Sequence, residues 1–308
     1  MLEPILKTSV VAEMRGIYAG YVDRTVLSNL SVILQAKEVV ALAGPNGAGK
    51  STFVRVLTGT LPPREGDVAC DPGDIALVPQ EIALYPWLTA KENCIAFAMM
   101  DGISRREACV RANVALEMTE CATISSKKVS SLSGGYRRRV NIAVALMAAP
   151  NLLIMDEPTA GLDADAKRVV QDVMLRIREN GCGVLIVTHD FDVIEHVADR
   201  VLVLSDGKLV QDLPPEGLIA SVCGNRRPVE LQFTDVPEEG HSRALLMAGG
   251  IPYGASRWVF LRERSDGELG ALREMVDRAG LRVAETRVRE PNLADAYSIL
   301  MKAEARSA

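Results

Sequence analysis

A glycine-rich stretch after a short apolar segment constrains the fold of this chain more than any other feature. Residues 39–43 are apolar throughout, and residues 44–52 then read Gly-Pro-Asn-Gly-Ala-Gly-Lys-Ser-Thr. A strand, a glycine, four free positions, Gly-Lys-Ser and a helix together form the pattern of a phosphate-binding loop. Glycine tolerates positive φ and close approach of another backbone, so successive N–H groups of such a loop can converge on phosphate oxygens. The stretch therefore predicts a nucleotide-phosphate site rather than an ordinary strand-to-helix turn.

The residues of this loop have distinct expected roles. Lys50 is expected to reach the β and γ phosphates of a nucleotide, and Ser51 to be a magnesium ligand. The helix from about Thr52 would point the positive end of its dipole at the same phosphates. The predicted nucleotide-binding residues of the loop are Gly44, Pro45, Asn46, Gly47, Ala48, Gly49, Lys50, Ser51 and Thr52.

Composition and charge exclude several classes of protein. A chain of 308 residues is long enough for one large domain and a smaller one. Its net charge of −5 gives no general attraction to nucleic acid or to an anionic membrane surface. No apolar run is long enough to cross a bilayer, and the N-terminus lacks the basic and apolar regions of a secretory signal. We therefore expect a cytosolic protein that binds no nucleic acid.

The cysteines indicate neither a metal site nor a redox motif. Six of them are spread along the chain, at positions 70, 94, 109, 121, 182 and 223. They form no Cys-x-x-Cys pair and have no histidine beside them. We expect free thiols in a reducing compartment.

Strands and helices alternate along the chain up to about residue 213. Apolar segments of strand length are expected at 14–18, 30–34, 39–43, 67–69, 75–78, 152–155, 184–187, 201–204 and 209–211. Helices are expected at 53–57, from 89, over 104–117, after 133, over 164–179 and up to 198. Strands that are apolar throughout and alternate with helices are typical of a mainly parallel sheet covered on both faces. We predict an α/β fold with a β-rich N-terminal part and a helical insert at about 86–135.

Three of the expected strands are followed by residues that carry chemistry. Gly44 follows the strand 39–43, Asp156 follows 152–155, and His189 lies just beyond 184–187. In parallel α/β sheets the ligand binds at the carboxyl ends of the strands. The three residues are therefore expected at one edge of the sheet, where they predict a single catalytic site.

Asp156 and Glu157 suit magnesium-assisted hydrolysis. One carboxylate can hold the metal, directly or through water, while the next orients and deprotonates the attacking water. The alternative is a pair of acids ahead of a turn at Pro158. The phosphate loop earlier in the chain favours the catalytic interpretation, with Asp156 as the metal ligand and Glu157 as the base.

His189 and Gln80 are expected beside these carboxylates. A histidine at the phosphate edge can stabilise the charge that develops on the γ-phosphoryl group. Gln80 follows the strand 75–78, so its side chain can reach magnesium or water from one side and the helical insert from the other. We predict that Gln80 is a metal ligand and couples the site to the insert.

A second anion-binding turn is expected at Ser133, Gly134 and Gly135, which open a helix. Free N–H groups and a hydroxyl at a helix start can hold a phosphate, although the same residues could form a simple N-terminal cap. One nucleotide hardly needs two such sites in one subunit. The arrangement is explained if this turn completes the nucleotide site of another copy, so that ATP lies between two subunits.

The order of these motifs resembles the nucleotide-binding subunit of ATP-binding cassette (ABC) transporters. The residues that carry the resemblance lie within about 12–221 and are Gly44 to Thr52, Gln80, Leu132 to Gly135, Leu152 to Glu157, Gly161 to Asp163, and His189. The resemblance implies that Tyr21, with Tyr18 as the alternative, stacks on adenine. It also implies that Glu157 is the general base, that Asp163 lies in a loop joining the two sites, and that Ser133 and Gly135 contact the γ-phosphate of the opposite subunit.

Two residues or stretches depart from the family pattern. Tyr136 stands where a glutamine usually follows the signature glycines, and the turn at 36–38 lacks its usual glycine. Ser133, Gly134 and Gly135 are intact, so the phosphate chemistry is expected to be unaffected.

The C-terminal part, about 225–308, is predicted to be a small α+β accessory domain. Strand-like and helix-like runs alternate in it after a change of composition near residues 214–228. Residues 290–297 read Glu-Pro-Asn-Leu-Ala-Asp-Ala-Tyr, which is similar to a closing segment of cassette ATPases that serve exporters of drugs, lipids or polysaccharides. The alternative is an amphipathic helix that begins at a proline. The similarity favours export over import.

The sequence thus predicts a subunit that binds ATP and Mg²⁺, dimerises and drives a separate integral-membrane permease from the cytoplasmic face of the membrane. The insert would dock on the permease, with Trp87 either in that contact or in the core. The alternative is a soluble cassette ATPase acting on ribosomes or DNA. It predicts a second cassette or a long coiled-coil insert, and the sequence has neither. A binding module without turnover is opposed by the intact Glu157.

Overall fold

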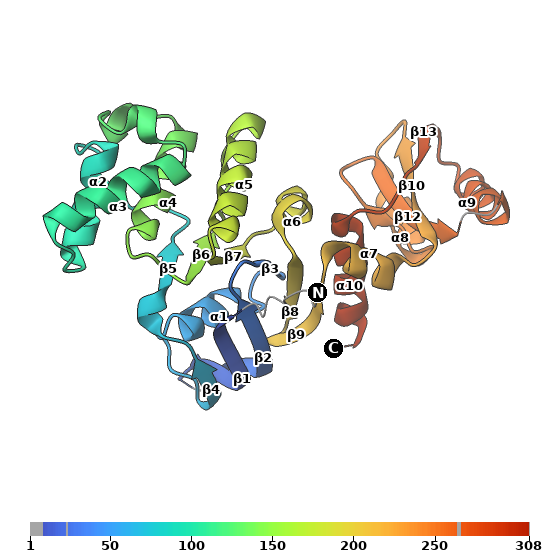
Figure 1. Ribbon diagram of the computed structural model, residues 1–308. Coiled ribbons are helices and arrows are strands. Elements are labelled where there is room, and N and C mark those ends of the chain that lie inside the picture. The colour runs from blue at the N-terminus through green and yellow to red at the C-terminus, as the bar shows by residue number, and fades with distance from the viewer. Residues whose placement is uncertain (1–8, 23, 264–265, 308) are drawn as a thin grey trace, which may run out of the picture. The chain divides into compact units, whose positions relative to one another are not determined.

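The computed structural model describes residues 9–22, 24–263 and 266–307 (Figure 1). The chain divides into two compact units, of which the first ends at Pro215 and the second begins at Glu216. The first unit contains two sheets and the second unit one, and each unit has a hydrophobic core of its own. None of the described helices is long and apolar enough to span a membrane.

A mainly parallel sheet forms the centre of the first unit, as the sequence predicts. Its strand order is β5-β6-β7-β3-β8-β9, and only β9 runs antiparallel to its neighbour. The strands are β3 (Val39–Ala43), β5 (Ile75–Val78), β6 (Leu152–Asp156), β7 (Gly183–Val187), β8 (Arg200–Ser205) and β9 (Lys208–Leu213). β3 and β7 are buried along their whole length, because both faces of the sheet are covered.

The first unit also has a three-stranded antiparallel sheet of order β2-β1-β4. It contains β1 (Val10–Tyr21), β2 (Arg24–Gln35) and β4 (Glu65–Ala69). In sequence, β1 and β2 come before the phosphate loop and β4 comes after it. Buried residues alternate with more exposed ones along β2, so only one face of this sheet packs on the core. The predicted strands at 14–18 and 30–34 are too short, because the polar residues on the outer face belong to the strands as well.

The helix α1 (Lys50–Leu57) lies in the core that these two sheets share. Phe53, Val56 and Leu57 are buried in it, together with Leu30 of β2 and Leu202 of β8. The helix begins at Lys50 rather than in the middle of the Ser-Thr-Phe run, because Gly49 is its N-terminal cap.

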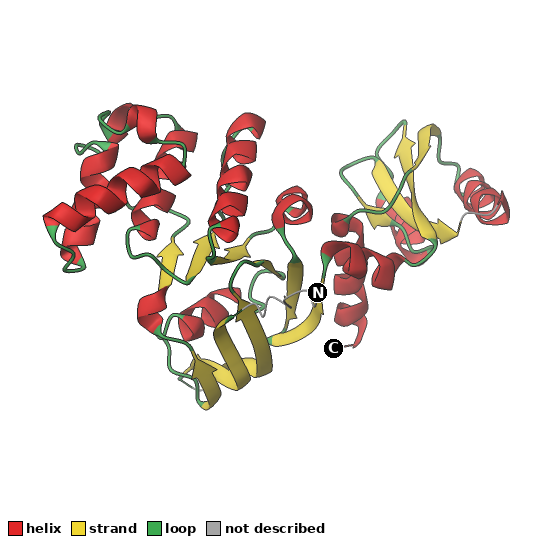
Figure 2. Cartoon of the chain, in the orientation of Figure 1, coloured by secondary structure: helices red, strands yellow, loops and turns green. Residues whose placement is uncertain are grey.

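The helices of the insert form a separate lobe of the first unit (Figure 2). They are α2 (Ala90–Met100), α3 (Arg105–Met118) and α4 (Gly134–Leu146), with short 3-10 turns at Ala122–Ile124 and Val129–Ser131 and another at Pro72–Asp74 before β5. Thr89 and Glu92 form a capping box at the start of α2. The helix α5 (Ala164–Glu179) packs on β7 and β3, and α6 (Phe191–Val197) packs on α5.

The second unit has a four-stranded antiparallel sheet of order β11-β12-β10-β13. Its elements are α7 (Pro215–Cys223), β10 (Arg226–Phe233), α8 (Glu239–Met247), β11 (Ile251–Pro252), β12 (Arg257–Glu263), α9 (Asp266–Arg278), β13 (Val283–Val288) and α10 (Leu293–Ser307). From β10 to β13 the order is β-α-β-β-α-β, a ferredoxin-like arrangement. The predicted α+β character of this region is confirmed, whereas α7 and β11 were not predicted.

Candidate functional site

The phosphate loop combines two left-handed glycines with one close backbone approach. Gly47 has φ 83° and Gly49 has φ 108°, in the region that favours glycine. Gly44 is not among the residues with positive φ. A Cβ on Gly44 would lie 2.4 Å from the carbonyl oxygen of Leu204 in β8, so only glycine fits there.

The side chain of Lys50 folds back on this loop and binds its backbone. Its ammonium group Nζ donates to the carbonyl oxygens of Gly44 at 2.6 Å and of Pro45 at 3.0 Å. Burial lowers the pKa of Lys50, while the negative charges of Glu157 and Asp156 oppose that shift. Lys50 of the loop after β3 and the acidic residues at the end of β6 therefore influence each other at the carboxyl edge of the sheet.

Asp156 is half-buried at the end of β6. Burial raises its pKa, and the neighbouring charge of Glu157 raises it further, whereas Lys50 and Arg138 lower it. Burial and Glu157, the larger causes, both disfavour the charged carboxylate, and a divalent metal bound there would stabilise it.

Glu157 is held in an unusual backbone conformation. Its φ is 45°, which few non-glycine residues adopt. Its N–H donates to the carbonyl oxygen of Val187 at 2.8 Å, so the backbone remains tied to β7 while it turns. Such strain is found at functional sites, where the surrounding structure imposes it.

The two carboxylate oxygens of Glu157 have one partner each. The buried hydroxyl of Thr188 donates to Oε2 at 3.0 Å, and Nδ1 of His189 lies 2.7 Å from Oε1. The Glu157 side chain is only 15% exposed, whereas that of His189 is 85% exposed. Thr188 also accepts from the N–H of Asp190 at 3.1 Å, which fixes its hydroxyl between β7 and α6. The buried Thr188 thus fixes one oxygen of the Glu157 carboxylate, and the other oxygen contacts the imidazole of His189 at the surface.

Arg138 of α4 reaches the segment that contains Gln80. Its guanidinium donates to the carbonyl oxygens of Pro79 at 3.0 Å and Gln80 at 2.7 Å. Arg138 is 5% exposed, and its Nε has no hydrogen-bond partner among the described residues. The side chain of Gln80 is exposed and forms no hydrogen bond with the described residues. Arg138 therefore contacts Gln80 through its backbone carbonyl alone.

Tyr21 lies beside the first turn of α1. Arg55 of α1 donates to its hydroxyl at 2.8 Å, and the guanidinium carbon lies 5.8 Å from the ring centroid. A hydrogen bond with Thr52, and more weakly the contact with Arg55, lowers the pKa of Tyr21. These contacts connect the end of β1 with the phosphate loop.

The second glycine turn lies at the start of α4. Ser133 is the N-terminal cap of this helix, and its hydroxyl accepts from the N–H of Tyr136 at 3.5 Å. A Cβ on Gly135 would lie 2.9 Å from Cβ of Ala166 in α5, so a larger residue would collide with that helix. Asp163 caps α5 by accepting from the N–H of Ala166 at 2.8 Å. The signature turn and the loop of Asp163 are therefore neighbours.

Comparison with known proteins identifies the family. The sequence pattern described as "ABC transporter" matches residues 27–160. Linearmycin resistance ATP-binding protein LnrL of Bacillus subtilis is 35% identical over 209 residues, 64% of this chain and 67% of that protein. Nod factor export ATP-binding protein I of Sinorhizobium fredii is 31% identical over 308 residues, 94% of this chain and 86% of that protein. This chain belongs to the ABC transporter family. It is an ATPase of the ATP-binding cassette type.

Solved structures support the same assignment. An ATP-binding subunit of an ABC transporter is 27% identical with a TM-score of 0.60, over 68% of this chain and 92% of that one. The cassette MJ0796, in a dimeric post-hydrolysis state with ADP and Pi, is 28% identical with a TM-score of 0.58, over 66% of this chain and 98% of that one. These matches confirm the cassette fold, and the match to the Sinorhizobium fredii protein continues through the second unit.

Within the cassette, the structure brings together only part of the predicted residue set. Lys50, Asp156, Glu157 and His189 form one interacting group, and Tyr21 joins the loop through Thr52. In the described part of the chain, no hydrogen bond or ion pair joins Ser133, Gly134 or Gly135 to that group. Thr188 and Arg138 were not predicted. Arg138 could have been suspected from its spacing, because it lies four residues before the buried Ile142 on one face of α4.

Proposed function

We propose that this protein is the ATP-hydrolysing subunit of an exporter, and that it dimerises around ATP and Mg²⁺ to power a separate membrane permease. The observation that carries the proposal is the Glu157 carboxylate, held by Thr188 and His189 beside Lys50 and Asp156. The first unit would be the ATPase domain, and the second unit an accessory domain.

The loop residues 44–52 fit the phosphates of ATP. The left-handed Gly47 and Gly49 turn the loop so that its N–H groups can converge, and α1 begins at Lys50. Ser51, Asp156 and Gln80 would hold Mg²⁺, which when bound supplies positive charge to the phosphate oxygens. Tyr21 would stack on adenine, because its contacts with Thr52 and Arg55 place its ring beside the loop.

Glu157 would orient the attacking water and accept its proton. Thr188 would keep one carboxylate oxygen in place, and His189 would stabilise the charge that develops at the γ-phosphoryl group. Gln80 would report the state of the site to the helical lobe, since its backbone is tied to α4 by Arg138.

A second copy would complete the site. Ser133, Gly134 and Gly135 would face the ATP of the opposite subunit, and Asp163 would connect the two sites through its contact with α5. The cassette MJ0796, to which this chain is similar, is dimeric with ADP and Pi bound, which supports the proposal of a pair. A monomer would hydrolyse ATP slowly, because its own loop lacks this closing face.

The helical lobe would dock on the permease. Trp87 is 64% exposed, so the alternative that it lies in the core is wrong. Its ring lies 5.5 Å from that of Tyr85, which stacks on Phe97 of α2, and Met100 is also exposed. An exposed aromatic and methionine cluster next to the Gln80 segment suits an apolar helix of a membrane protein. The subunit would then be cytoplasmic, on the inner face of the membrane.

Export is favoured by the relatives, which are named for Nod factor export and for linearmycin resistance. Relatives of those names are more consistent with removal of a small molecule from the cell than with uptake. The alternative, a soluble ABC ATPase acting on ribosomes or nucleic acid, has no observation that favours it.

The proposal can be tested by purifying the chain with the membrane protein encoded beside its gene. We expect ATPase activity that rises on co-reconstitution with that protein in vesicles, and loss of co-purification in Trp87→Glu. Co-purification with ribosomes instead of a membrane protein would overturn the transport function. Equal binding by wild type and Trp87→Glu would overturn the docking site.

A further inference from the structure

The sheet of the second unit has one protected edge and one open edge. β11, at one edge, is two residues long and contains Pro252, which has no N–H to offer to another strand. β13, at the other edge, has six residues and no proline. In the described chain, its outer side pairs with no strand. Open edges of this length are sites where a further strand can add.

The hydrogen-bonding pattern identifies the backbone groups that face outward. The N–H of Arg289 donates to the carbonyl oxygen of Pro228 at 3.2 Å, and the register then pairs Arg287 with Glu230 and Thr286 with Leu231. In an antiparallel pair, alternate residues point their N–H and C=O groups toward the partner strand. Arg287 therefore faces β10, whereas Thr286 and Val288 point their backbone groups toward the open side. Ala284 lies where the register shifts and ends the regular ladder.

A cavity lies directly beside this edge. It has a volume of about 740 Å³ and is lined by α9 residues Leu269, Leu272 and Val276 and by β13 residues Ala284, Thr286 and Val288. Helix α9 thus leaves part of the inner face of β13 uncovered. A strand added to β13 would direct alternate side chains into this space.

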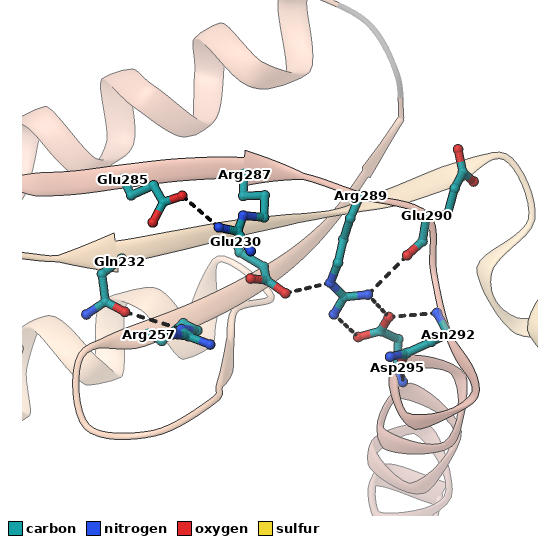
Figure 3. Close-up of polar contacts among 9 residues, drawn as sticks. All are labelled: Glu230, Gln232, Arg257, Glu285, Arg287, Arg289, Glu290, Asn292 and Asp295. Atoms are coloured by element: carbon teal, nitrogen blue, oxygen red, sulfur yellow. Dashed lines mark hydrogen bonds and ion pairs between the residues drawn. The ribbon is translucent and has the colours of Figure 1, made fainter. Parts of the chain in front are cut away.

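The opposite face of β13 carries two charges of opposite sign. Glu285 and Arg287 form an ion pair of 3.0 Å, and their side chains are 60% and 64% exposed (Figure 3). Because they lie two residues apart on one strand, they flank Thr286 symmetrically. The segment Glu285-Thr286-Arg287 is therefore complementary in charge to its own reversed copy.

We propose that β13 pairs antiparallel with β13 of a second copy of this chain, with Thr286 on the two-fold axis. Thr286 would then exchange two backbone hydrogen bonds with Thr286 of the other copy, and Val288 would face Ala284. Glu285 would lie opposite Arg287 of the other copy, twice, in the closely spaced pairs where side chains meet. The inward side chains of each β13 would cover the cavity of its partner.

Charge selects this register over its neighbours. In the two nearest registers that still match outward groups, Thr286 pairs with Ala284 or with Val288 of the other copy. The first sets Glu285 opposite Glu285 and the second sets Arg287 opposite Arg287, and like charges directly opposite each other are unfavourable. A shift by one would match outward groups with groups already bonded to β10. Only the register centred on Thr286 satisfies both the backbone and the charges.

Backbone bonds and apolar burial would supply most of the affinity, because exposed ion pairs contribute little. The contact involves only the second unit. It needs no nucleotide, unlike the dimer proposed around ATP, so the two associations can be measured separately.

The first experiment measures self-association of the full chain by sedimentation without ATP or Mg²⁺. We expect dimers for the wild type, and dissociation constants about tenfold higher for Glu285→Arg and for Arg287→Glu, since each introduces two like-charge contacts. The double charge swap Glu285→Arg with Arg287→Glu should restore dimerisation. A monomeric wild type, or a swap no better than the single variants, would overturn the proposal. Dimers that appear only after ATP and Mg²⁺ are added, equally in all four proteins, would also overturn it, because they would be the dimer proposed around ATP.

The second experiment tests the register by oxidation. In the proposed pair, the Cα atoms of the two Thr286 residues lie about 5.5 Å apart, within the range of a disulfide. The Cα atoms of the two Glu285 residues lie about 7–8 Å apart, which is too far. Thr286→Cys should therefore give a covalent dimer on a non-reducing gel, above the background of the oxidised wild type, and Glu285→Cys should not. Equal yields from the two variants would exclude this register.

Discussion

Two arginines, one in each unit, show how differently the two parts of this protein use charge. Arg138 of the first unit binds only carbonyl oxygens, and burial lowers its pKa while Asp156 opposes that shift. Arg289 of the second unit binds two carboxylates, at 2.5 Å to Glu230 and at 2.5 and 2.9 Å to Asp295, and these raise its pKa, Asp295 most. The first cation keeps its charge available to the site, and the second is neutralised within the fold.

The second network explains the closing sequence motif in physical terms (Figure 3). The Asn292 N–H donates to Oδ2 of Asp295 at 3.0 Å, and the Asp295 N–H donates to Oδ1 of Asn292 at 3.0 Å, which caps the start of α10. Arg289 binds the same Asp295 and also Glu230 of β10. The polar residues of the motif therefore attach α10 to the sheet, so the contacts of this motif are structural.

The largest expected effect tests whether the negative charge of Glu157 in the first unit takes part in catalysis. Glu157→Gln keeps the shape of the side chain but removes the base, so ATP hydrolysis should fall about 10²- to 10⁴-fold. ATP binding should remain, because the loop residues are unchanged. Phosphate release and equilibrium nucleotide binding measure the two properties separately.

The matched control is Glu179→Gln, at the exposed end of α5, which should leave hydrolysis unchanged. Equal rates for wild type and Glu157→Gln would remove the catalytic assignment. Failure of the Gln variant to dimerise with ATP would leave the base in place but remove the proposed shared site.

The next effect tests whether charge in the second unit is structural. Arg289→Met leaves the partly buried Glu230 and Asp295 without their cation, which should cost about 2 kcal/mol of stability in this unit. The rate of ATP hydrolysis by the full chain should not change. Hydrogen exchange along α10 and thermal unfolding measure the loss.

Arg278→Met is the control for Arg289→Met. Its ion pair with Glu274 is exposed, with side-chain accessibilities of 80% and 71%, so it should cost less than about 0.5 kcal/mol. If Arg289→Met were to lower hydrolysis without faster exchange in α10, the distinction between the two arginines would be wrong.

That residues after β3, β6 and β7 meet at one edge of the sheet could be predicted from the sequence, because they follow strand ends in a known order; their roles toward a nucleotide stay predictions. Prediction from the sequence fails for Arg138, whose partners are backbone carbonyls of Pro79 and Gln80, since a carbonyl partner can belong to any residue type. It also fails for Thr188, because the bond to Glu157 joins residues that only the pairing of β6 with β7 brings together. Spacing identifies groups on one element, and sheet topology determines which groups meet.

The second unit shows a related limit. The change of composition near Pro214 and Pro215 predicted no helix there, yet α7 begins at Pro215, where proline is favoured at the first helical position. The short β11 lacks the length that marks a strand in sequence. Strand-like runs in the sequence predicted β10, β12 and β13, although β13 carries Glu285, Thr286 and Arg287. The open edge of β13 follows from strand order alone.

A smaller effect on hydrolysis tests how Glu157 is aimed. Thr188→Val removes the hydroxyl that donates to Oε2 without changing the shape of the side chain, so hydrolysis should fall about tenfold. Thr188→Ser keeps the hydroxyl and should retain most of the activity. The KM for ATP should be similar in all three proteins, because the side-chain hydrogen bonds of Thr188 in the described chain are with Glu157 and Asp190 and not with the phosphate loop. A rise in KM with an unchanged kcat would assign Thr188 to nucleotide binding instead.

The smallest effect is expected at Tyr136, whose ring contacts a third arginine, Arg139. The guanidinium carbon of Arg139 lies 4.4 Å from the Tyr136 ring centroid, a cation–π contact worth about 0.5–1 kcal/mol. Tyr136→Phe keeps the ring and should behave as the wild type. Tyr136→Gln should lower the free energy of unfolding of the cassette by no more than about 1 kcal/mol, with hydrolysis changed by no more than about threefold. The Ser133 cap needs only the Tyr136 N–H, which both variants retain. A fall in hydrolysis as large as that of Thr188→Val, at unchanged stability, would show that this side chain acts on the nucleotide of the opposite subunit.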